Sequence, residues 1–307
     1  MFPGINGITQ QYLANLARTE TQLQQTTQNI SSGIDVNLPS DNPAAIAQIF
    51  QTEAALANNK QIQTNLSTVT TEVNTADSAL QTAVQTLSSA ISIATQGATS
   101  TSTANNRAVL AQQVAGIQQT LVGIAQTQVN GRYIFSGDQD TQAPYQLDST
   151  QPEGVQQLVT GASTRTIQSV DGTSFAVALT AQQIFDAKNP DGTPAVGNVF
   201  AAVQNLQTAL TNNDTAGISS ALTSLQSASS YLNDQLAFYG QVQNRVQQAT
   251  SLAQKFQTQE QTQLSNLQDT DIPTAAAELT KLQTQEQASM TVEATIQQQK
   301  NLFSFLA

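Results

Sequence analysis

Residues 66–94 read LSTVTTEVNTADSALQTAVQTLSSAISIA, and the spacing of their apolar residues decides the fold. These residues recur in strictly alternating steps of three and four, at Leu66, Val69, Val73, Ala76, Leu80, Ala83, Leu87, Ala90 and Ala94. This spacing places one apolar stripe along a helix and predicts that the stripe packs against other helices as in a coiled coil. Ser40, Asp41 and Asn42 precede Pro43, which is typical of a helix start, so the helix should run from 43 to about 97.

Two further segments carry the same spacing. A polar turn at 98–103 is followed by a stripe from Leu110 to Ile124, which predicts an antiparallel neighbour for the first helix. From about residue 197 onward a third helical segment carries two more stripes, joined near Gly240. The predicted core of this helical bundle comprises Leu66, Val69, Val73, Leu80, Leu87, Leu110, Val114, Ile117, Leu121, Leu225, Leu232, Val246 and Phe256.

The periodicity changes in the middle of the chain. Residues 131–137 are aromatic and bounded by glycines, and short β-prone runs follow at 155–160, 164–170 and 174–179. The Asp171-Gly172 pair is typical of a hairpin turn. The sequence therefore predicts a small β-rich insert at about 131–196.

Both ends of the chain are weaker helices with narrow apolar stripes in a background of Gln and Thr. Burying one such side chain contributes ~1.5–3 kcal/mol, whereas ordering each of these residues costs about 1 kcal/mol or more. We therefore expect the ends to be disordered or fraying in an isolated chain and to become helical when copies associate. The predicted assembly interface comprises Leu13, Leu16, Leu23, Ile30, Leu282, Val292, Ile296, Phe303 and Leu306.

The predicted fold class is mainly α: an elongated antiparallel coiled-coil or helical-bundle rod with a small β-rich insert. The order of elements is nearly palindromic, so the two chain ends should lie side by side. Five regions are predicted: an N-terminal assembly helix and loop (1–40), the first half of the rod (41–130), the insert (131–196), the second half of the rod (197–268) and a C-terminal assembly helix (269–307).

Composition excludes several classes of function. The chain has no Cys and no His, so thiolate and imidazole metal sites and Cys- or His-dependent catalysis are excluded, and Asp and Glu are scattered. We predict no catalytic, cofactor or metal site. The net charge of −11 disfavours nucleic acid, and no apolar run approaches the ~20 residues that a membrane span needs. The N-terminus lacks the basic region and apolar run of a cleavable signal peptide.

Motifs near both ends resemble those of the bacterial flagellin superfamily. Asn29-Ile30-Ser31-Ser32-Gly33, followed by Asn37 to Ala45, is similar to the N-terminal signature of that family. Gly240-Gln241-Val242-Gln243-Asn244-Arg245 is similar to its C-terminal Gly-x-x-x-Asn-Arg element. The segment Gly131 to Gly137 and the segment Glu278 to Glu286 resemble the members that join the flagellar hook to the filament more than they resemble filament subunits.

The resemblance implies a non-enzymatic structural subunit that joins hook to filament through paired terminal helices. It implies self-association in a ring or tube, contact with the hook-side junction protein and with flagellin, and an export chaperone on the C-terminal helix. It also implies an extracellular place in the flagellum, reached by type III export without a cleavable signal. Two alternatives stay open: the filament flagellin itself, and a secreted coiled-coil tip or effector protein of another export system.

Overall fold

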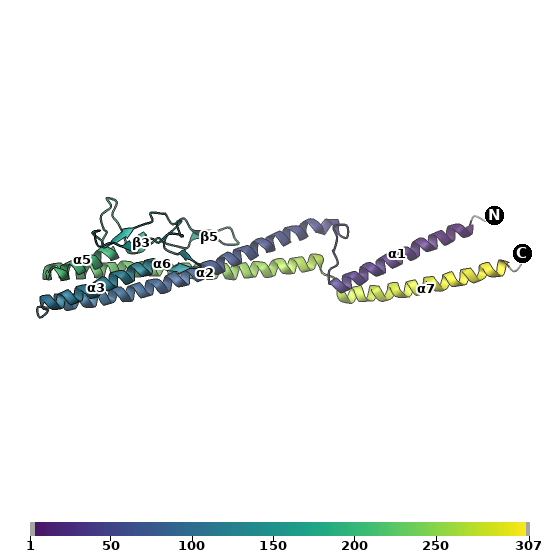
Figure 1. Ribbon diagram of the computed structural model, residues 1–307. Helices are drawn as coiled ribbons and strands as arrows, with labels where there is room; N and C mark the ends of the chain where they lie inside the picture. Colours follow the sequence, from purple (N-terminus) through teal and green to yellow (C-terminus); the bar gives the residue numbers. More distant parts are fainter. Residues whose placement is uncertain (1–3, 305–307) are drawn as a thin grey trace. The chain divides into compact units, whose positions relative to one another are not determined.

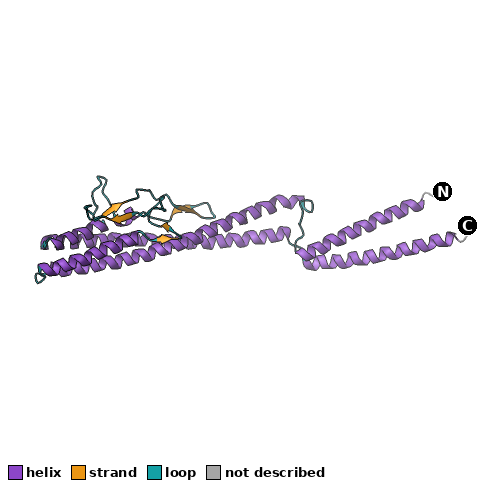
Figure 2. Ribbon diagram, in the orientation of Figure 1, coloured by secondary structure: helices purple, strands orange, loops and turns teal. Residues whose placement is uncertain are grey.

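The computed structural model describes residues 4–304, and the side chains of residues 10–295. The chain is mainly helical, with short strands confined to its middle (Figure 2). This confirms the predicted fold class. Its contacts divide it into two compact units, one formed by Asn59–Phe256 and the other by the residues before and after that range.

The Asn59–Phe256 unit is organised around long helices that lie side by side (Figure 1). They are α2 (Pro43–Ala98), α3 (Ala104–Ala125) and α6 (Thr215–Gln268). The α2 residues of the three-and-four stripe are all buried, because the stripe faces the other helices. Two amides mark the α2–α6 contact: Asn59 Nδ2 donates to the carbonyl of Ala253 at 2.9 Å, and Gln243 Nε2 donates to Asn74 Oδ1 at 3.2 Å.

Most of the predicted core residues lie in one continuous buried cluster. Ile117 is only partly buried against that cluster. Phe256 is not a core residue, since 37% of it is exposed. Ala253, three residues before it on α6, is fully buried, and its carbonyl accepts from the buried side chain of Asn59.

Helix α5 (Val199–Thr211) packs on α3, and its separation from α6 is a feature that periodicity did not predict. Asn198 caps its first turn, with Oδ1 accepting from the amide of Ala201 at 2.8 Å. The helix ends at a turn where Asn213 adopts a positive φ of 53°. Asp214 Oδ1 then accepts from the amide of Gly217 at 3.0 Å, which caps the start of α6.

The β-rich insert contains three separate antiparallel hairpins. They pair β1 (Gln128–Val129) with β2 (Arg132–Tyr133), β3 (Tyr145–Leu147) with β4 (Val155–Gln157), and β5 (Thr166–Gln168) with β6 (Ser174–Ala176). The strands are shorter than predicted, and the hairpins do not join into one sheet. The short helix α4 (Ala181–Phe185) was not predicted; Thr180 and Gln183 form its capping box.

An aromatic cluster packs the insert against the helices. Phe135 meets the rings of Phe185 and of Tyr239 on α6 edge-on, with centroids 6.2 and 6.4 Å apart. The ring centroid of Phe200 on α5 lies 5.8 Å from that of Phe185 and 5.1 Å from that of Tyr145. Phe135 is fully buried, so it has a packing role and does not form a binding platform.

Candidate assembly surface

The two end helices lie side by side, as the order of elements predicts (Figure 1). They are α1 (Gly4–Ser32) and α7 (Ile272–Ser304). Because the end of α1 meets the start of α7, where Thr270 Oγ1 donates to the carbonyl of Asn29 at 3.2 Å, the two helices are antiparallel. This pair, together with the loop 33–42, carries the predicted assembly interface.

Asn29 is the centre of the hydrogen bonds that hold this loop. Its Nδ2 donates to Asp35 Oδ1 at 2.8 Å, and its Oδ1 accepts from Asn37 Nδ2 at 3.3 Å. Its carbonyl accepts from the amide of Gly33 at 2.8 Å as well as from Thr270. Through its side chain and its carbonyl, one residue therefore connects α1, the loop and the turn before α7.

Gly33 ends α1 in a conformation that favours glycine, with φ of 75°. Its carbonyl accepts from the amide of Thr270 at 2.9 Å, and the amide of Asp35 donates to the carbonyl of Gln268 at 2.7 Å. These reciprocal bonds join the backbone after α1 to the backbone between α6 and α7. The Ser-Ser-Gly motif thus marks the point where the end of α1 meets the segment between α6 and α7.

The second half of the signature closes the loop onto α2. Asp41 Oδ2 accepts from the amides of Asn37 and Leu38 at 3.0 and 2.7 Å. Asn42 Oδ1 accepts from the amide of Ala45 at 3.2 Å, which caps α2. A small apolar cluster lies under the loop, formed by Val36, Ala45 and Ile49 with Ile46, Leu264 and Leu267 packed against it.

The apolar residues of the end helices remain largely exposed in the single chain. Leu13 is 51% exposed and Val292 is 52% exposed, while Leu16, Leu23 and Ile30 are partly exposed. Among the described side chains of α1 none is buried, and among those of α7 only Leu282 is. Ile296 and Phe303 lie within α7 but their side chains are outside the described set, and Leu306 is outside the described residues.

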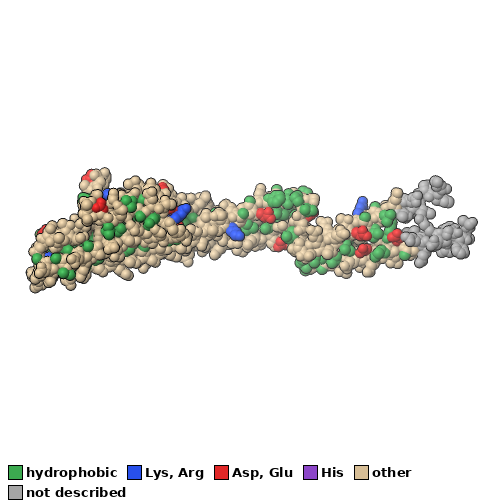
Figure 3. All heavy atoms as spheres, viewed as in Figure 1, with side chains coloured by type: hydrophobic (Ala, Val, Ile, Leu, Met, Phe, Trp, Pro, Cys, Tyr) green, Lys and Arg blue, Asp and Glu red, His purple; other side chains and the backbone are tan. Residues whose placement is uncertain are grey.

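The structure has both ends as helices and does not show the disorder that was expected, while fraying of these helices in an isolated chain stays a prediction. The helices pair with each other, and the bonds around Asn29 anchor them at one end. Four further apolar residues of the same unit are exposed but are not among the predicted interface residues, namely Leu38, Phe50, Ile272 and Met290. Figure 3 shows apolar side chains gathered over this part of the chain.

The described residues contain no group of three or more Asp and Glu side chains close enough to hold a metal ion. None of the described helices is both long enough and apolar enough to cross a membrane. What the surface offers is exposed apolar area on a pair of helices that is anchored at one end. Such area is suited to packing against other helices.

Two family models match the chain. The bacterial flagellin N-terminal helical region matches residues 5–140, and the bacterial flagellin C-terminal helical region matches residues 215–306. The first match covers α1, the loop 33–42, α2 and α3, and the second covers α6 and α7. The residues between the two matches form most of the insert and α5.

Curated relatives include the flagellar hook-associated protein 3 of Escherichia coli K12 and that of Salmonella typhimurium LT2. Each is 27% identical over 209 residues, which is 66% of this chain and 64% of the relative. The match therefore spans slightly less than two thirds of the length of these relatives.

Solved structures have the same fold. A putative flagellar hook-associated protein from Vibrio parahaemolyticus has a TM-score of 0.64 and 17% identity, over 75% of this chain and 100% of that chain. A flagellar hook-associated protein-3 from Legionella pneumophila has a TM-score of 0.61 and 14% identity, over 71% and 98%. The two family models together match more than half of the chain, and they show that it belongs to the bacterial flagellin family, whose members are structural proteins and not enzymes.

Proposed function

We propose that this chain is a structural subunit at the junction between the flagellar hook and filament, and that it polymerises through its paired end helices. One observation carries the proposal: α1 and α7 form a defined pair whose described apolar side chains, Leu282 excepted, are not buried within the chain. A pair that buries so little gains little free energy to offset the cost of ordering it. Neighbouring copies would supply the missing contacts.

The likeness to two hook-associated proteins 3 supports the junction over other places in the flagellum. On this proposal the subunit forms a ring or tube, contacts the hook-side junction protein on one side and flagellin on the other, and lies outside the cell. Export proceeds through the flagellar type III apparatus, with a chaperone on the C-terminal helix beforehand. The filament subunit is the alternative that an experiment must exclude.

A deletion strain tests the proposal. If the chain is the junction subunit, the strain assembles hooks without filaments and sheds flagellin into the medium, and expression of the chain restores filaments. If the chain is the filament subunit, the strain sheds no flagellin, because the filament protein itself is missing. Filaments of normal length and number in the deletion strain would contradict both assignments.

A further inference from the structure

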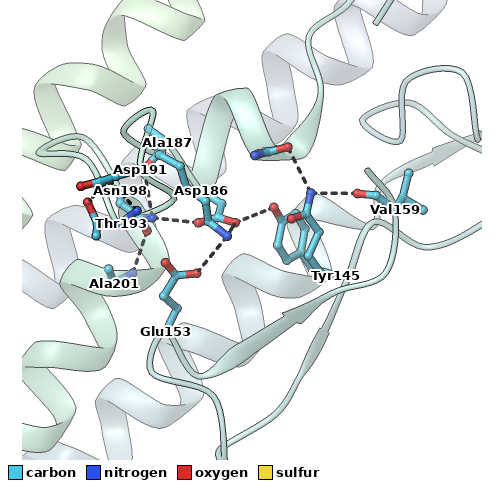
Figure 4. Close-up of polar contacts among 12 residues, drawn as sticks. Tyr145, Glu153, Val159, Asp186, Ala187, Asp191, Thr193, Asn198 and Ala201 are labelled. Carbon is cyan, nitrogen blue, oxygen red and sulfur yellow. Dashed lines mark hydrogen bonds and ion pairs between the residues drawn. The ribbon is translucent and has the colours of Figure 1, made fainter. Parts of the chain in front are cut away.

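A polar cluster lies buried where the insert meets the helices (Figure 4). Its centre is Asp186, which follows α4 and is 0% exposed. Tyr145 Oη on β3 donates to Asp186 Oδ2 at 2.8 Å, and Asn198 Nδ2, at the start of α5, donates to Oδ1 at 2.8 Å. Lys188 Nζ lies 3.1 Å from Oδ2. The carboxylate therefore links β3 to the segment between α4 and α5.

Glu153 brings a second carboxyl group to this cluster. It lies in the loop between β3 and β4, and its Oε2 is 3.8 Å from Lys188 Nζ. Its side chain is only 14% exposed. Its backbone carbonyl accepts from Gln118 Nε2 on α3 at 2.9 Å, so this loop also connects the insert to the helices.

The charges of the cluster do not balance when both carboxyl groups are ionised. Two carboxylates then share Lys188, the cation that the described contacts give to them. A surplus negative charge in a site with little solvent is costly unless it takes up a proton. A protonated Glu153 removes the surplus, and the remaining Asp186–Lys188 pair is neutral.

The pKa of Glu153 follows this arrangement. Burial raises the pKa of the Glu153 carboxyl, the Asp186 carboxylate raises it as well, and the Lys188 ammonium lowers it, which together bring this pKa to about 7. The other groups that face the cluster are neutral amides from α3 and from the start of α5, and the Tyr145 hydroxyl. Burial raises the pKa of that hydroxyl too, so it stays a donor throughout the neutral range.

We propose that Glu153, Asp186 and Lys188 form a pH-operated latch between the β3–β4 hairpin and the helices, which is closed while Glu153 holds its proton. The pKa of Glu153 in the closed state exceeds its ordinary value of 4.5. The contribution of protonated Glu153 to the stability of the closed state is therefore fully present below pH 4.5. It is lost as the pH rises through about 7. The open latch frees the loop of residues 148–154 from α3. This inference does not depend on the proposed place of the chain in the flagellum.

Native-state hydrogen exchange of the full chain tests the latch. The opening of residues 145–157, corrected for the intrinsic pH dependence of exchange, should increase at least about tenfold between pH 5 and pH 8. Glu153→Gln places a neutral side chain of the same shape there, so its opening should stay at the wild-type pH 5 level throughout. Glu278→Gln changes an exposed carboxylate that pairs with Lys281, and it should follow the wild type.

Two results would overturn the latch. In the first, wild type and Glu153→Gln have the same pH profile in this segment. In the second, Glu153→Gln is already as open at pH 5 as the wild type at pH 8, because a neutral side chain would then not close the latch. A carbon-13 NMR titration of Glu153 in the full chain, with a midpoint near 4.5, would also contradict it.

Discussion

Arg107 on α3 donates a hydrogen bond from Nη1 to Asn213 Oδ1, 2.6 Å away in the turn between α5 and α6. The same guanidinium donates from Nε to the carbonyl of Gly97 at 2.8 Å and from Nη2 to that of Thr99 at 3.1 Å. One buried cation thus joins the α2–α3 turn to the α5–α6 turn. Helices α2 and α5 approach closely near this cation, because a Cβ added at Gly97 on α2 would lie 2.6 Å from Leu210 Cδ2 on α5.

Replacing this cation should destabilise the bundle. Arg107→Met leaves three acceptors without their donor, so the free energy of unfolding should fall by about 2–4 kcal/mol. Urea denaturation of the purified chain measures this. Arg132→Met is the control, since Arg132 pairs with Asp140 at the surface and its loss should cost about 0–1 kcal/mol. Equal losses for the two variants would contradict the proposed role of Arg107.

The same truncation should have different costs in the bundle and in the end helices. Leu80 is fully buried, so Leu80→Ala should lower the free energy of unfolding by about 2–5 kcal/mol. Leu13 is half exposed, so Leu13→Ala should change the value by less than about 1 kcal/mol. Urea denaturation of the monomeric chain compares the two. A larger loss for Leu13→Ala would mean that the end helix is packed within the chain.

The hairpin formed by β5 and β6 should depend on Arg245. The Arg245 guanidinium carbon lies 4.2 Å from the centroid of the Phe175 ring on β6. Arg245→Ala should therefore weaken the docking of the hairpin on α6 by about 0.5–2 kcal/mol, and Arg245→Lys should weaken it less. Faster hydrogen exchange in residues 166–176 reports the change. Lys255→Ala, at an exposed position of the same helix, serves as the control and should leave this segment unchanged.

The helices could be predicted from the sequence because their stripes repeat over many turns. The Leu66 to Ala94 stripe lies in the buried face of α2, and Pro43 begins that helix. The break between α5 and α6 was missed, since a polar turn ending in Asn213 and Asp214 contains neither Gly nor Pro. The exposure of Phe256 was not predicted either. An apolar stripe indicates which face of a helix packs, but it does not give the side chains that the neighbouring helix places opposite each residue.

The insert and the hydrogen bonds around Asn29 were harder to predict, because they depend on contacts between residues that are distant in sequence. The strands pair over only two or three residues, and tertiary contacts such as Phe135 against Tyr239 hold them. No local pattern gives contacts between residues so far apart in sequence. The signature around Asn29 and Asp41 could be recognised in the sequence as a resemblance. The hydrogen bond from Thr270 to Asn29 could not be predicted, because the two residues are 241 positions apart. The polar cluster around Asp186 gave no sequence signal.

Charged substitutions on the end helices should block assembly without unfolding the chain. Leu16→Asp and Val292→Asp place a charge on the exposed apolar faces of α1 and α7, where a neighbouring copy would bury it. Incorporation into hook-seeded polymers should be lost, while the helical signal and the urea midpoint of the monomer stay close to wild type. Gln24→Asp, at an exposed position of α1, is the matched control and should still incorporate. Normal incorporation of all three variants would contradict the assignment of this surface.

Hydrogen exchange of residues 10–30 and 273–295, compared between the purified monomer and the assembled polymer, tests the central claim most directly. We expect fast exchange in the monomer, because helices with almost no buried side chain among those described open locally at little cost in free energy, and strong protection in the polymer. Strong protection of both segments already in the monomer, with no further gain on assembly, would contradict it.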